Sequence, residues 1–138
     1  MSTKREQILD YVKTQLEAVS GINEVTINQV NPVDLETVKL PCIFIYFGRE
    51  TRLAAGQGVI GYETWELELN LEVWGMNEDM EDLLGKIHTK MHSVETMGGL
   101  LKTSYRTGVD MLVIDPEQAL QAMSIDYLLI YQHIKGTM

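Results

Sequence analysis

Residues 62–75 read YETWELELNLEVWG, and this stretch decides the fold class. Apolar and polar side chains alternate along it, a period of two that predicts a β-strand with one buried face and one face in water. The apolar face consists of Trp65, Leu67, Leu69, Leu71 and Val73, and the polar face of Thr64, Glu66, Glu68, Asn70 and Glu72. Beyond Gly75 the apolar period changes to about 3.6 residues, which predicts a helix that begins at Asn77. Its apolar stripe comprises Met80, Leu83, Leu84, Ile87, Met91 and Val94.

The rest of the chain supplies one more helix and further strands. Thr3 and Glu6 spell a capping box before apolar residues at helical spacing, so a helix is expected over about 3–20. Strands are expected over 24–30, over 42–47 as a central strand, and over 123–134 as an interior strand. Residues 100–106 and 109–114 predict strands, or a hairpin that turns through Thr107-Gly108.

The expected order is therefore α-β-β-β-α-β-β. Because neighbouring strands are joined directly, the prediction is an α/β (α+β) fold with an antiparallel or mixed sheet of about four to five strands. Two helices would pack on one face of this sheet, and residues 1–138 would form a single domain. The polar face of the 63–73 strand would then lie on the open side of the sheet.

The negative charge of the chain is concentrated in one place. Its formal net charge is -9, and between Tyr62 and Gly85 there are eight acidic residues without a lysine or arginine. Glu78, Asp79, Glu81 and Asp82 fall in the first turns of the second helix, where they complement its dipole. Three acids remain as candidates for a lumen or contact surface, and these are Glu66, Glu68 and Glu72. A solvated face that keeps the sheet soluble is the alternative.

Composition excludes several classes of function. A pI of about 4.7 argues against affinity-driven nucleic-acid binding, because phosphates are neutralised by lysine and arginine. No apolar run approaches the roughly 20 residues that a membrane span requires. The single cysteine, Cys42, lies in an apolar run and is expected to be a reduced, buried thiol in a soluble protein made in the cytoplasm.

Residues 49–61 show no clear period, and we interpret them as a long mobile loop or β-arm. Six residues of this arm are candidates for contacts with a partner: Arg49, Arg52, Leu53, Gln57, Val59 and Ile60. Residues 56–61 also spell GxGxxG, but the helix that a dinucleotide fingerprint requires is missing, so no cofactor is expected. A connection without any partner remains the other interpretation of the arm.

Catalytic chemistry is the weakest hypothesis. His88 and His92 have the i, i+4 spacing of two metal ligands on a helix, and Glu95 could be a third. The glutamate of the HExxH motif is absent, and Lys90 would oppose a cation. The chain also lacks a Gly-x-Ser-x-Gly elbow. We therefore expect no catalytic residues, with a small metal-dependent enzyme built on His88 and His92 as the alternative from another class.

The chain as a whole resembles the tail terminator (tail completion) proteins of long-tailed bacteriophages. The resemblance is carried by the first helix ending in Val19-Ser20-Gly21-Ile22, the apolar run 40–46, the 49–61 arm, the opening 62–65 of the alternating strand, Val73-Trp74-Gly75, the helix 80–97 and the last strand 126–131. It implies a non-enzymatic protein that forms a hexameric ring, caps the tail tube, stops its polymerisation and presents a docking surface to the head.

The same resemblance implies where the protein acts and what it meets. The implied partners are the tail tube protein and the head–tail connector protein, with DNA passing through the ring without sequence-specific binding. The implied location is the host cytoplasm during assembly and then the virion tail. A head–tail connector or other neck protein remains open as the nearest alternative, and a monomeric ligand-binding domain as a third.

Overall fold

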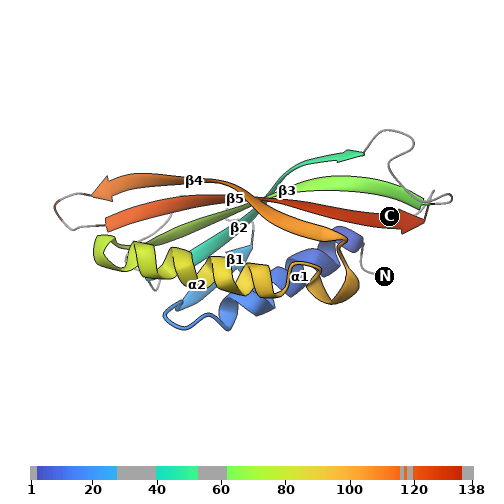
Figure 1. Ribbon diagram of the computed structural model, residues 1–138. Coiled ribbons are helices and arrows are strands. Elements are labelled where there is room, and N and C mark those ends of the chain that lie inside the picture. Colours follow the sequence, from blue (N-terminus) through green and yellow to red (C-terminus); the bar gives the residue numbers. More distant parts are fainter. Residues whose placement is uncertain (1–2, 28–39, 53–61, 116, 118–119, 135–138) are drawn as a thin grey trace.

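The computed structural model describes residues 3–27, 40–52, 62–115, 117 and 120–134 (Figure 1). The chain runs through α1 (Lys4–Glu17), β1 (Glu24–Ile27), β2 (Cys42–Arg52), β3 (Tyr62–Met76), α2 (Met80–Ser93), β4 (Thr103–Asp115) and β5 (Leu120–Ile134). Short 3₁₀ turns at 77–79 and 97–99 flank α2. The predicted order α-β-β-β-α-β-β is confirmed.

The five strands form one mixed sheet in the order β1-β2-β3-β5-β4. β1 is parallel to β2, and the other neighbours are antiparallel. β3 and β5 pair over their whole length, from Tyr62 opposite Ile134 to Met76 opposite Leu120. The strand predicted by alternation therefore lies in the middle of the sheet, and the last strand is interior as expected.

Both helices lie against the same face of the sheet (Figure 1). The core between the layers contains Ile8, Val12 and Leu16 of α1, Met80, Leu83, Ile87 and Met91 of α2, and the odd-numbered residues Leu67, Leu69, Leu71 and Val73 of β3. Among the described residues, no helix lies on the opposite face of the sheet (Figure 1). Two helices on one face of a mixed sheet is the architecture that the sequence predicted.

The helix ends differ by a few residues from the expected ones. α1 begins after Thr3, whose hydroxyl oxygen accepts the Glu6 N–H at 3.2 Å, as the capping box predicted. It ends at Glu17, three residues before the expected end, because the backbone then tightens and turns toward Gly21 at φ +92°. α2 begins at Met80, since residues 77–79 form a 3₁₀ turn and Asn77 makes no side-chain cap.

Residues 103–115 form one strand, so the hairpin considered through Thr107-Gly108 is wrong. β4 pairs with β5 on both sides of Thr107, and the register shifts between Arg106 and Gly108 and again between Val113 and Asp115. A shift of this kind is a β-bulge, which uses the same small, turn-favouring residues as a hairpin turn. The small residues Thr107-Gly108 do mark an irregularity in the chain, but pairing with β5 makes it a bulge and not a turn.

Another bulge lies in β2, between Phe47 and Glu50. Leu69 of β3 pairs with Phe47 on one side and with Tyr127 of β5 on the other, and Tyr127 pairs with Arg106. This bulge and the one between Arg106 and Gly108 therefore lie at the same level on either side of the central strand pair. Bulges increase local twist, and the sheet is strongly twisted near its middle (Figure 1).

Candidate partner-binding surfaces

The face of the sheet opposite the helices carries the acids predicted from the alternating strand. Glu66, Glu68 and Glu72 occupy the even positions of β3, on the opposite side from Leu67, Leu69 and Leu71. The ladder adds further acids, among them Asp126 of β5, which lies opposite Asn70, and Asp110 of β4, which lies opposite Ser124, itself opposite Glu72. We call these five residues, Glu66, Glu68, Glu72, Asp110 and Asp126, the acidic face.

Sequence reasoning missed Asp126 because its strand was expected to be interior, and it missed Asp110 because the partner of the 109–114 strand could not be predicted. A weak signal was present in the spacing of Ser124 and Asp126, two polar residues at alternate positions. None of the described residues that the ladder places on this face is a lysine or an arginine. Arg49 lies inside the β2 bulge and is assigned to neither face.

Three of the five carboxylates are held by hydrogen bonds. Glu72 accepts from the indole N–H of Trp74, and Glu68 Oε2 accepts the backbone N–H of Arg49 at 3.2 Å. Asp126 Oδ1 accepts from the side-chain amide of Asn70 at 2.8 Å. These negative charges are therefore fixed in position on the sheet.

The two bulges border a hollow of about 440 Å³ on the acidic face. Glu68, Asn70 and Asp126 line it together with Gly48 and Thr107 from the bulges. A Cβ atom on Gly48 would lie 2.9 Å from Glu68 Oε2. Glycine at this position therefore leaves room for the Glu68 carboxylate.

The predicted arm is partly described. Arg49–Arg52 continue β2 and pair with β3, which fits the β-arm interpretation for these residues. Arg52 lies 3.7 Å from Glu63 and is largely exposed, and Arg49 is also exposed. The other four candidate contacts, Leu53, Gln57, Val59 and Ile60, lie outside the described residues.

A cluster of side chains on the helix side holds the base of this arm. Arg5 of α1 forms an ion pair with Glu50 of β2, with 3.2 Å between Nε and Oε2, and its guanidinium lies over the Phe47 ring at 5.3 Å. Burial and a hydrogen bond with Glu50 raise the pKa of Tyr131. The β2 bulge is thus tied to the first turn of α1.

His88 and His92 lie one turn apart on the exposed surface of α2, with their rings stacked at 6.4 Å between centroids. No group of three His, Cys, Asp or Glu residues within the described ranges could hold a metal ion. The two histidines instead border a small pocket of about 250 Å³ between α2 and β4, with Glu95, Arg106 and Tyr127.

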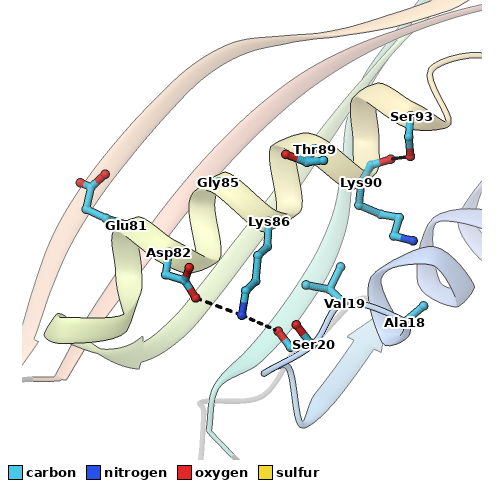
Figure 2. Close-up of a pocket in the computed structure, with 10 residues that line it drawn as sticks. All are labelled: Ala18, Val19, Ser20, Glu81, Asp82, Gly85, Lys86, Thr89, Lys90 and Ser93. Atoms are coloured by element: carbon cyan, nitrogen blue, oxygen red, sulfur yellow. Dashed lines mark hydrogen bonds and ion pairs between the residues drawn. The ribbon is translucent and has the colours of Figure 1, made fainter.

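A wider groove of about 620 Å³ separates the end of α1 from α2 (Figure 2). Lys86 spans it, with its ammonium 3.0 Å from Asp82 and 3.4 Å from the Ser20 carbonyl oxygen. Figure 2 shows Lys90 extending toward the same groove one turn later. The polar side chains in this groove are exposed to solvent or paired with each other, so the groove suits contact with a partner better than catalysis.

Cys42, the lone thiol, is fully buried in β2. Burial, together with the negative charge of Glu24, raises the pKa of this thiol to about 12. A thiol that stays protonated is a poor nucleophile.

Neither helix in the described part of the chain is long and apolar enough to cross a membrane.

No protein-family model matches the chain, and no curated protein matches it in sequence. Among solved structures, the chain is similar to one from the virion of a native gene transfer agent (GTA) particle. The match covers 94% of this chain and 92% of that one, with 6% identity and a TM-score of 0.41. A likeness at this level leaves the function to be argued from the chain's own residues.

Proposed function

We propose that this protein is a non-enzymatic virion protein that forms a ring on the end of a phage tail tube. In this role it terminates tube polymerisation and presents a docking surface to the head. The proposal rests on the resemblance of the sequence to tail terminator proteins, and the observation that carries it in the structure is the acidic face. In the described part of the chain, this face carries five carboxylates, no helix lies over it, and none of its ladder positions is a lysine or an arginine.

Such a face suits the lumen of a ring through which DNA passes. Like-charge repulsion keeps a polyanion from adhering, and repeated copies around a ring add to the same field. Because three of the carboxylates are held by hydrogen bonds, their charge does not swing away from the lumen. The helix layer would then lie on the outer side of the ring.

The arm supplies the second element of the proposal. Arg49 and Arg52 are exposed cations, and in the sequence they precede a segment that contains glycines and apolar residues. We expect this arm to contact the tail tube protein or a neighbouring subunit, since apolar residues in a long connecting segment can become ordered on a partner. A head–tail connector protein would bind the opposite side of the ring.

The test is electron microscopy of the purified protein mixed with phage tail tubes. We expect a ring of this protein at one end of each tube, and tubes of uniform length when the protein is present during polymerisation. Binding to head portals without any binding to tubes would replace the proposal with a head–tail connector or neck protein. Metal bound stoichiometrically and lost in a His88→Ala variant would instead support an enzyme.

The lumen placement is tested separately, with a triple variant that carries Glu66→Gln, Glu68→Gln and Glu72→Gln. We expect rings to form on tubes while DNA delivery falls, measured as infectious particles per assembled particle, because DNA now meets a less repulsive wall. The matched control carries Glu78→Gln, Glu81→Gln and Asp82→Asn, which remove the same charge from the helix layer. Equal infectivity of the two variants would contradict the lumen placement.

A further inference from the structure

The phenolic oxygen of Tyr127 is buried without a hydrogen-bond partner in the described structure. The side chain is 3% exposed, yet the residue lines the pocket of about 250 Å³ between α2 and β4. Leaving a buried hydroxyl unsatisfied costs roughly 1–3 kcal/mol, so such groups in native proteins usually have a partner that the protein alone does not show. The Tyr127 hydroxyl is therefore a buried donor that is available to a bound acceptor.

The chain places a cation beside this donor. Arg106 of β4 lies directly opposite Tyr127 in the ladder, which brings their side chains to one face at neighbouring positions. Burial raises the pKa of Tyr127 to about 12, and the Arg106 charge partly offsets this shift. Arg106 is exposed and forms no ion pair with any described residue. A guanidinium and a phenol thus border one small space.

Helix α2 completes the wall with His88 and His92, whose stacked rings line the same pocket. The floor is fixed, because the Ser104 hydroxyl donates to the Glu95 carbonyl oxygen at 2.9 Å. Apart from Glu95, the polar side chains that line the pocket can each donate a hydrogen bond to a ligand. The pocket therefore suits an anion, in a chain whose overall charge is -9.

The size and charge of the pocket limit which class of anion it can bind. At about 250 Å³ it is smaller than the roughly 300–1,000 Å³ of sites for whole small molecules, so it accepts a group of side-chain size. Glu95 lines it as well, and this carboxylate disfavours a doubly charged phosphate. A carboxylate needs only one compensating cation, and it matches the fork of a guanidinium.

We propose that this pocket binds a carboxylate group, held by the Arg106 guanidinium and the Tyr127 hydroxyl between the two histidines of α2. Two sources carry this chemistry: a free small carboxylate, or an aspartate or glutamate side chain of a second copy of this chain. The site does not depend on the ring function, since a carboxylate can bind a single copy.

The direct test is an NMR titration of the full chain with sodium propionate, following the ring protons of His88 and His92. Sodium chloride at the same ionic strength is the control for screening. We expect saturable shifts, with an affinity that falls about tenfold in Tyr127→Phe and by at least that factor in Arg106→Gln. The matched controls are Tyr46→Phe, on the opposite face of the sheet, and Lys13→Gln, on α1, and both should bind propionate as the original chain does.

Three results would overturn the proposal. One is the absence of saturable shifts, and another is unchanged affinity in either Tyr127→Phe or Arg106→Gln. The third is tighter binding of inorganic phosphate than of propionate, which would assign the pocket to another anion. A purely structural role for Tyr127 would appear as a Tyr127→Phe protein that is more stable to heat and binds propionate unchanged.

Sedimentation velocity separates the two sources. If an acidic side chain of a second copy occupies the pocket, saturating propionate and Arg106→Gln both shift assemblies toward the monomer, whereas Lys13→Gln on α1 does not. If propionate binds and self-association is unchanged, the source is a free carboxylate. Failure to form rings on tail tubes would remove the proposed function while the propionate result stands.

Discussion

Glu50 shows how one partly covered carboxylate anchors the base of the arm. Its side chain is 16% exposed, and Arg5 contacts it from the first turn of α1 while also covering Phe47. Arg52 and Glu63 form the contrasting pair at the same end of the sheet, longer at 3.7 Å and with the arginine 63% exposed. The covered pair contributes stability, and the exposed one contributes little, because water screens it.

We therefore expect Arg5→Gln to lower the free energy of unfolding by about 1–2 kcal/mol, since Glu50 loses its cation while remaining covered. Arg52→Gln is the matched control and should change it by less than about 0.5 kcal/mol. Urea unfolding followed by tryptophan fluorescence measures both. Equal effects of the two variants would show that Arg5 does not anchor the arm.

Because its thiol is buried, Cys42 makes the free energy of unfolding fall at alkaline pH. Burial raises the pKa of its thiol from 9.0 to about 12, so the folded state holds the proton more tightly than the unfolded state. This contribution is fully present below pH 9 and is lost as the pH rises toward 12. We expect the free energy of unfolding to fall less steeply in Cys42→Ala than in the original chain between about pH 9 and pH 11. Parallel curves from urea unfolding at several pH values would contradict this.

Among the elements, α2 contains a glycine, Gly85, that neither the backbone conformation nor a close contact requires. A Cβ atom on Gly85 would meet nothing within 4 Å, because the residue borders the open groove between α1 and α2 (Figure 2). Gly48 in the β2 bulge is the opposite case, with Glu68 in the space that a Cβ would take. One glycine is free to change, and the other is required by a close approach.

Gly85→Ala should therefore raise the free energy of unfolding by about 0.5–1 kcal/mol, because alanine favours the helix. Gly48→Ala should lower it, since the Glu68 carboxylate must move from its hydrogen bond with Arg49. Thermal unfolding of both variants measures the contrast. A stabilised Gly85→Ala protein that no longer binds tubes would assign the α1–α2 groove to a partner.

The elements themselves were largely predictable from the sequence. Strict alternation in β3 and the apolar stripe of α2 are local patterns, and both predictions are confirmed. β4 was the difficult element, because Thr107-Gly108 suits a turn and a bulge equally. Only the pairing of β4 with β5 on both sides of the bulge decides between them.

For the whole molecule, the long pairing of β3 with β5 carries the fold independently of the arm. We expect deletion of Gly56–Gly58 to leave the unfolding curve unchanged, because the core lies between the sheet and the helices. The same deletion should reduce ring formation on tail tubes, measured by counting capped tube ends in micrographs. Normal capping by the deletion variant would mean that the arm does not contact the tube.

The sequence by itself determined which segments are helices and strands, their order, and the placement of Glu66, Glu68 and Glu72 on one face. These features depend on the period of neighbouring residues, which the chain carries locally. Only the tertiary structure decided that β5 lies between β3 and β4, which added Asp110 and Asp126 to the acidic face. It also brought Arg106, Tyr127 and His88 to one pocket. Pairings between segments distant in sequence set these contacts, and a local pattern does not encode them.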